Sequence, residues 1–296
     1  MKILIAGSSG MIGSAATRHL LAGGHDVTRL VRHTPGPSEV WWDPDAGKID
    51  AASLDGFYGV VHLATKPWPM RWTHSAQQTM LANRLGTNRL LADSLAGCAH
   101  RPRVLMCASG MGYYSSSGDD VLSEDCPAGA SFLATLQRDG EAATAPATQA
   151  GIRVVHLRIP PVIGGATLLR TPFPSGSGQQ WVSWIGRDEL ASIIEFALAT
   201  ESLSGAVNAV SPNPMHNADF VQALAQALGR RPGGRMPTPV IRLVMGEMGE
   251  EFMLASRRME PAKLLAAGYQ FRYPELTQAV QHEMESANAG ASSRAN

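Results

Sequence analysis

The stretch GSSGMIG, residues 7–13, restricts the fold of this chain more than any other segment. It follows KILIAG, a short apolar run typical of a buried strand. It leads into MIGSAATRHLLAGG, which has the pattern of a helix that ends at a glycine pair. HDVTRLVR then predicts a second strand. A buried strand, a helix and another strand in this order form the βαβ unit of a parallel sheet.

The three glycines of this stretch have the spacing G-x-x-G-x-x-G. Glycines permit a tight turn and let backbone N–H groups approach a pyrophosphate, while the following helix directs its positive dipole end at the phosphates. A glycine pattern alone is a weak signal, but between the first strand and first helix of a βαβ unit it predicts dinucleotide binding.

The alternation of strands and helices continues to about residue 160. The next predicted elements are strand 59–64, helix 77–97, strand 103–108, helix 132–151 and strand 153–159. Pro146 weakens the second of these helices, because proline has no backbone N–H. The pattern predicts an α/β protein with a doubly wound parallel sheet, the Rossmann fold.

Composition excludes several classes of function. Of the 296 residues, 44% are hydrophobic and 17% are charged, which suits a packed core. Lys plus Arg and Asp plus Glu both number 25, so nothing favours nucleic acid or a membrane surface as a partner. No apolar stretch approaches the ~18–20 residues of a membrane helix, and the run before Gly7 is too short for a signal peptide. We expect a soluble cytoplasmic protein.

The cysteines and histidines lack the spacing of a metal site. Cys98, Cys107 and Cys126 are odd in number, and no H-x-x-H or H-E-x-x-H arrangement occurs. The sequence therefore predicts free thiols and no metal.

Arg32 and His33 stand at the end of the second predicted strand, where NAD sites usually have an acidic residue. A carboxylate there would repel a 2′-phosphate, whereas a guanidinium binds it through two parallel N–H groups. The sequence favours NADP(H) over NAD. The alternative is that Arg32 is a solvated residue at the end of a strand.

Several segments fall in the order and at the spacing of extended short-chain dehydrogenases/reductases. They are GSSGMIG, HLAT (62–65), ANRLGTNRLL (82–91), ASGMGYY (108–114) and LRIPPVIGG (157–165). Further segments restrict the resemblance to one branch of this superfamily. They are RWT (71–73), GSGQQWVSWI (176–185), NAVSPNPMHNADF (208–220), GEM (246–248) and GYQFRYPEL (268–276). From Met1 to about residue 283 the chain resembles the atypical branch called the NAD-dependent epimerase/dehydratase family. Members of that branch end in a short C-terminal domain of unknown function.

The resemblance implies a set of cofactor-binding residues. Those for the pyrophosphate are Gly7, Gly10, Met11, Ile12 and Gly13. Arg32 would bind the 2′-phosphate, and the residues beside the adenosine would be Leu63, Ala64 and Thr65. Arg84 is a further candidate contact, or else an arginine on a helix surface.

The region beyond residue 160 has a looser pattern. Residues 160–184 are rich in Gly, Pro and Ser and predict loops, and a helix is expected to open on Asn217 as its capping residue. We expect residues 1–235 to form the NADP-binding domain, with substrate-lobe insertions at about 160–220. A smaller, mostly helical C-terminal lobe is expected at 236–285, and a disordered tail at 286–296.

The chemical site departs from the pattern of the superfamily. There, a Ser or Thr after the fourth strand binds the substrate carbonyl, and a Tyr-x-x-x-Lys pair on the next helix completes the site. Ser109 matches the first position, but Leu133 and Gln137 stand at the other two, and neither moves a proton at neutral pH. Tyr113 is the remaining candidate for proton transfer. The alternatives are a turn role for Ser109 and a packing role for Tyr113.

These residues and the resemblance predict an NADP(H)-binding oxidoreductase that acts on a small carbonyl or alcohol. Ser109 would polarise the carbonyl, and Tyr113 or a water would supply the proton. Two alternatives stay open. One is a sugar-nucleotide epimerase or dehydratase, against which the missing Tyr/Lys pair counts. The other is a non-catalytic NADPH-binding or redox-sensing protein, which the missing pair favours.

Overall fold

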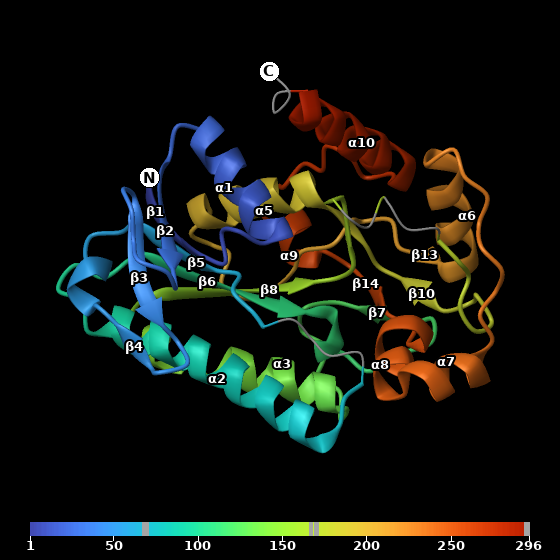
Figure 1. The fold of residues 1–296 in the computed structure, drawn as a ribbon, viewed down its shortest axis with the longest axis horizontal. Helices are drawn as coiled ribbons and strands as arrows, with labels where there is room; N and C mark the ends of the chain where they lie inside the picture. The colour runs from blue at the N-terminus through green and yellow to red at the C-terminus, as the bar shows by residue number, and fades with distance from the viewer. Residues whose placement is uncertain (67–70, 166–167, 169–171, 293–296) are drawn as a thin grey trace.

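The centre of the structure, a computed structural model that describes residues 1–66, 71–165, 168 and 172–292, is an eight-stranded sheet (Figure 1). Its strands are β1 (Lys2–Ala6), β2 (Asp26–Val31), β3 (Glu39–Asp43), β4 (Lys48–Ile49), β5 (Gly59–His62), β6 (Val104–Gly110), β8 (Arg153–Ile159) and β12 (Gly205–Asn208). Their order is β12-β8-β6-β5-β1-β2-β3-β4, and all neighbours are parallel except β3 and β4. The chain order reverses at β1, which lies between β2 and β5. The carboxyl ends of these strands are where ligands bind in such sheets.

Helices cover both faces of this sheet (Figure 1). One face is covered by α1 (Met11–Ala22) and α5 (Arg187–Ala199), and the other by α2 (His74–Ala96), α3 (Phe132–Ala142) and α4 (Ala145–Gln149). The predicted doubly wound Rossmann fold is therefore confirmed. The predicted helix 132–151 is two helices, because the chain breaks ahead of Pro146, which lies in the first turn of α4.

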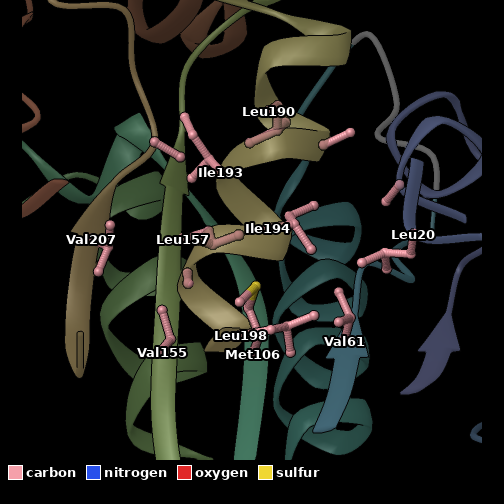
Figure 2. Close-up of a cluster of buried hydrophobic side chains, with 14 of the residues drawn as sticks. Leu20, Val61, Met106, Val155, Leu157, Leu190, Ile193, Ile194, Leu198 and Val207 are labelled. Atoms are coloured by element: carbon pink, nitrogen blue, oxygen red, sulfur yellow. The ribbon is translucent and has the colours of Figure 1, made fainter. Parts of the chain in front are cut away.

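The core on the α5 face explains why that helix and the sheet pack together. Ile193, Ile194 and Leu198 of α5 meet Val155 and Leu157 of β8, and all five side chains are fully buried (Figure 2). Each such aliphatic side chain contributes about 1.5–3 kcal/mol when it leaves water. The alternate residues of the strands face α2 and α4, so both faces of the sheet are apolar.

The second half of the chain adds a lobe beside the carboxyl edge of the sheet (Figure 1). Its helical elements are α6 (Asn217–Ala227), α7 (Thr238–Met245), α8 (Glu247–Gly249), the π-helical turn η4 (Glu250–Leu254), α9 (Ala262–Ala266) and α10 (Leu276–Ser292). Three two-stranded sheets join the lobe together: β10 (Trp181–Val182) with β13 (Met215–His216), β9 (Val162–Ile163) with β11 (Ile185–Gly186), and β7 (Val121–Leu122) with β14 (Arg258–Met259). The C-terminal part is mostly helical, as predicted.

Several local predictions differ from the structure. The last two strands of the order, β3 and β4, were not predicted, and β9 and β10 lie where loops were expected. Asn217 does not cap α6: the cap position is His216, and the Asn217 side chain accepts a hydrogen bond from the Ser175 amide instead. Helix α10 continues to Ser292, into the segment predicted to be disordered from residue 286.

Glu283 of α10 ties the end of the chain to α5. Its carboxylate is buried, accepts a hydrogen bond from the Asp188 amide at 2.8 Å and pairs with Arg187 at 2.9 Å. Burial raises the pKa of Glu283. Helix α10 therefore supplies a hydrogen-bond acceptor for the first turn of α5. Helix α5 in turn packs against α1.

Within the described residues, no helix combines the length and the apolar character that crossing a bilayer requires.

Candidate functional site

The turn between β1 and α1 depends on its glycines. Gly7 has a φ of +81°, and a Cβ on it would lie 2.6 Å from the amide nitrogen of Ala64 in the loop after β5. A Cβ on Gly13 would lie 2.0 Å from the Gly7 carbonyl oxygen. Real Cβ atoms do not approach this closely, so both positions require glycine. The turn holds the start of α1 against the end of β1, at the carboxyl edge of the sheet.

The first turn of α1 offers free backbone donors. Gly10 is the N-cap, no side chain caps the helix, and no acidic residue lies in the first turn. The amides of Met11, Ile12 and Gly13 donate no hydrogen bond to the described residues. A helix N-terminus with unsatisfied N–H groups binds phosphate through these donors and its dipole.

Arg32 lies just beyond β2 and is exposed, with no ion-pair partner in the described part of the chain. His33 is different: its Nε2 lies 3.2 Å from Glu39, which Arg29 also contacts at 2.8 Å. A hydrogen bond from the Gly36 amide lowers the pKa of Glu39, so this carboxylate is ionised and already paired. Of the two candidates at the strand end, Arg32 is the one that is available to a phosphate.

The residues after β5 lie against the glycine turn. The backbone of Leu63 and Ala64 approaches Gly7, and Thr65 is exposed. Lys66, the last described residue before the gap, pairs with Asp45. The predicted adenosine residues are therefore at the same edge as the predicted pyrophosphate residues.

Arg84 belongs to α2, and its side chain reaches the end of β6. Its guanidinium donates to the Ala108 carbonyl at 3.0 Å, and burial lowers its pKa. Close by, burial lowers the pKa of His62 to about 3 and raises the pKa of the Cys107 thiol to about 12. These contacts favour a structural role for Arg84 over the predicted contact with cofactor.

A buried ion pair dominates the predicted chemical site. Arg158 of β8 binds Glu141 of α3 through Nε at 3.1 Å and Nη2 at 3.0 Å. Burial opposes ionisation of Arg158, but its bonds to Glu141 outweigh burial and raise its pKa. The Ser109 hydroxyl donates to the same carboxylate at 2.6 Å. Ser109 is the second-last residue of β6, which extends past the predicted strand end at residue 108, and its proton is directed into the protein.

The two tyrosines after Ser109 also contact Arg158. The ring centroid of Tyr113 lies 3.3 Å from the guanidinium carbon, and the Tyr113 side chain is half-buried. Tyr114 is fully buried, accepts a hydrogen bond from Arg158 and donates one to Asn208, both at 2.8 Å. Burial raises the pKa of Tyr114 to about 12. We call Ser109, Tyr113, Tyr114, Glu141 and Arg158 the Glu141 cluster.

The positions of the missing Tyr/Lys pair are filled by packing residues. Leu133 is buried, and a Cβ on Gly112 would lie 2.2 Å from its Cγ. Gln137 is also buried, with its Oε1 3.4 Å from the Ser109 hydroxyl. In a helix, residues 133, 137 and 141 share one face, which brings Glu141 to Ser109.

Glu141 and Arg158 were missed by sequence reasoning. Two signals pointed to them: the four-residue spacing after Gln137, and a charged residue at an inward position of the strand RVVHLRI. Neither signal reveals that the two residues pair, because they lie on different elements.

A cavity of about 370 Å³ adjoins the loop after β6. Met111 lines it on the sheet side, Pro161 lines it after β8, and α6 and η4 form the outer wall. Ser109 and Tyr113 are not among the residues that line it. Among the residues that follow Ser109 in the chain, Met111 is the first that lines the cavity.

Metal chemistry finds no support among the described residues, where no group of three or more His, Cys, Asp or Glu side chains is placed to hold a metal ion. The three cysteines are free thiols, as predicted.

Comparisons with known proteins agree with this architecture. The family model described as "NAD dependent epimerase/dehydratase family" matches residues 3–209, and that of "Domain of unknown function (DUF1731)" matches residues 236–283. An epimerase family protein of Mycobacterium bovis is 36% identical over 290 residues, which cover 94% of this chain and 96% of that protein.

Two solved structures are similar over 96% of this chain. The human epimerase family protein SDR39U1 (isoform 2), crystallised with NADPH, has a TM-score of 0.86 and 32% identity, and 99% of its chain is covered. A nucleoside-diphosphate sugar epimerase from Corynebacterium glutamicum has a TM-score of 0.79 and 34% identity, and 58% of its chain is covered.

Proposed function

The chain belongs to the NAD-dependent epimerase/dehydratase family, and from this premise we propose that it is an NADP(H)-dependent oxidoreductase. Its substrate is a small carbonyl compound or the corresponding alcohol. The observation that carries the proposal is the anion-binding edge: amides at the start of α1 and an exposed Arg32 beyond β2, neither of which has a partner among the described residues.

The chain's residues fit NADP(H) in two places. The amides of Met11, Ile12 and Gly13 would bind the pyrophosphate, and Arg32 would bind the 2′-phosphate that distinguishes NADP from NAD. The NADPH in the structure of human SDR39U1 supports this choice. When bound, the cofactor supplies or accepts a hydride.

The Glu141 cluster sets the conditions for proton transfer. To bind a substrate carbonyl, the Ser109 hydroxyl must leave Glu141, whose carboxylate keeps its two bonds to Arg158. The exchange replaces a hydrogen bond to a charged acceptor with one to a neutral carbonyl, so it costs about 1 kcal/mol, which binding of the substrate must supply. Tyr113 or a water then donates the proton.

The two other functions each have one supporting observation. The name of the Corynebacterium relative favours a sugar-nucleotide epimerase, although Leu133 and Gln137 replace the Tyr/Lys pair on which such enzymes generally rely. The bond from Ser109 to Glu141 favours a non-catalytic NADPH-binding protein, since the candidate hydroxyl is already satisfied. The cytoplasmic location expected from the sequence stays a prediction.

Replacing Arg32 tests the cofactor. In Arg32→Ala, NADPH affinity should fall about 10- to 100-fold, the loss of a charge-assisted contact of roughly 1.5–3 kcal/mol, while NADH affinity stays unchanged. Fluorescence titration with both nucleotides measures this. Arg89→Ala, which removes an exposed arginine paired with Asp93 on α2, is the matched control and should change neither affinity. Equal losses for NADPH and NADH in Arg32→Ala would refute the assignment.

Replacing Ser109 tests the chemistry. The wild-type protein should oxidise NADPH in the presence of at least one compound in a panel of small ketones and aldehydes. Ser109→Ala should lose most of this turnover and keep its NADPH affinity, and Tyr113→Phe should lose turnover if the phenol is the proton donor. Unchanged turnover in Ser109→Ala removes that role. Tight NADPH binding without turnover of any panel compound would support the non-catalytic function.

A further inference from the structure

The cavity beside the loop after β6 has an apolar lining. Phe173, Val182, Phe220, Val221 and Leu224 contribute to its walls. Its volume of about 370 Å³ lies near the lower end of the roughly 300–1,000 Å³ typical of small-molecule sites. A space of this size and character fits a small ligand that buries an apolar body.

Among the described residues of the lining, no charged group is available to a ligand. Among the described residues that line the cavity, Arg257 is the one with a charged side chain. Its Nε donates to the Tyr114 carbonyl at 2.9 Å, its Nη1 donates to the Glu251 carbonyl at 2.5 Å, and its Nη2 pairs with the Glu251 carboxylate. A diphosphate carries negative charges that need cations or several donors, and this lining offers no free cation.

The lining hydroxyls are also satisfied. Ser175 donates to the Met253 carbonyl at 2.9 Å. Ser183 donates to the Arg257 carbonyl and accepts from the Met259 amide, both at 2.9 Å. These groups hold the lobe together and gain nothing by turning to a ligand.

Asn217 is the exception. Its Oδ1 accepts from the Ser175 amide at 2.9 Å, and because the partner is a backbone donor, this contact fixes which end of the side chain is oxygen. The side-chain nitrogen, Nδ2, donates to no residue that the structure describes, although Asn217 is buried at the cavity wall. This nitrogen is not among the fully buried atoms that lack a partner, so water in the cavity reaches it, and an acceptor atom of a ligand can take the place of that water.

We propose that this cavity binds the apolar body of an uncharged carbonyl compound, with a second acceptor atom of the ligand, apart from the reacting carbonyl, bound by Asn217 Nδ2. The identity of this ligand as the substrate rests on the function proposed above, whereas its chemical class does not. In that reaction the carbonyl carbon accepts a hydride from the reduced nicotinamide, which becomes oxidised, and the carbonyl oxygen accepts one proton to give the alcohol.

Calorimetric titration of the NADP⁺-loaded protein tests the ligand class. The probe is 4-(4-methoxyphenyl)-2-butanone, which has an apolar ring, one ketone and an ether oxygen as its second acceptor, and UDP-glucose is the rival. The ketone should bind and UDP-glucose should neither bind nor displace it. Leu224→Trp, which fills the cavity, should weaken ketone binding more than about tenfold. The matched control Leu243→Trp, at an exposed position of α7, should leave it unchanged.

A second variant keeps the test independent of how well Leu224→Trp folds. Asn217→Asp keeps the acceptor for the Ser175 amide and removes the N–H donors, so ketone affinity should fall about fivefold, the equivalent of one hydrogen bond. UDP-glucose binding that displaces the ketone, or ketone affinity unaffected by Asn217→Asp, would overturn the proposal. Ketone binding that both variants weaken, without NADPH oxidation, would support the ligand class and refute the oxidoreductase.

Discussion

The glycine turn, residues 7–13, and the Glu141 cluster lie at the same edge of one sheet but treat their polar groups in opposite ways. At the turn, the amides of Met11, Ile12 and Gly13 have no partner in the described chain. In the Glu141 cluster, the Ser109 hydroxyl and the Arg158 guanidinium are bound inside the protein. The first region is built to receive a charged ligand, whereas the second is complete without one.

This difference separates two uses of polar residues. Unsatisfied donors cost little at a solvent-facing helix end, because water binds them until the ligand arrives. A buried charge has no such substitute and must be paired within the chain. Mutations in the cluster should therefore change stability first, and mutations in the turn should change binding first.

Removing Glu141 should give the largest effect. Glu141→Leu leaves the Arg158 guanidinium buried and without its partner, which should lower the free energy of unfolding by about 3–5 kcal/mol. Urea denaturation followed by circular dichroism measures it. Glu201→Leu is the control, since Glu201 pairs with Arg103 at 3.5 Å on the surface, and it should change stability by less than about 0.5 kcal/mol. Similar small effects in both variants would mean that the cluster does not depend on its ion pair.

Adding a methyl group to the turn should mainly abolish binding. Gly13→Ala places a Cβ 2.0 Å from the Gly7 carbonyl oxygen, so α1 must shift and its amides no longer converge on the pyrophosphate. NADPH affinity should fall by about 100-fold or more, since two or three hydrogen bonds to a charged group are lost. Fluorescence titration measures the loss.

Gly86→Ala, in α2, is the matched control for Gly13→Ala. A Cβ on Gly86 meets no atom within 4 Å, so Gly86→Ala should leave NADPH affinity unchanged and raise stability by about 0.5–1 kcal/mol. Normal NADPH affinity in Gly13→Ala would show that cofactor binding does not depend on the glycine turn, and the contrast between the two regions would be refuted.

A smaller effect should come from the buried His62, which ends β5 and lies edge-on against Trp42. Its pKa is about 3 when folded and about 6.5 when unfolded, so the unfolded chain binds the additional proton between these values. The stability contribution is complete above about pH 6.5 and is lost as the pH falls toward 3. Between pH 7.5 and pH 5 the loss should be about 2 kcal/mol.

His62→Phe removes this titration and keeps an aromatic ring beside Trp42. Urea unfolding at pH 7.5 and pH 5 should show the additional loss in wild-type protein and not in the variant. If the free energy of unfolding changed equally with pH in the two proteins, His62 would titrate normally in the folded state, and water would reach its side chain.

The sheet and the glycine turn follow from local patterns, which explains why they were predicted. Strand and helix periods and glycine spacing are visible in a short window of sequence. The pairing of Glu141 with Arg158 joins residues on separate elements, and the contact of Asn217 with Ser175 joins residues 42 apart, so neither leaves a local signal. Strand β3, next to the edge strand β4, is short and only partly buried, and its sequence EVWWD lacks a clear alternation.

The link from Glu283 to the amide of Asp188 has a consequence for how the protein is made. A ribosome synthesises α5 about ninety residues before it reaches the acceptor that completes the first turn of that helix. During synthesis the first turn of α5 therefore lacks this acceptor until α10 has emerged from the exit tunnel. The start of α5 is completed by a segment that is made later than every strand of the central sheet.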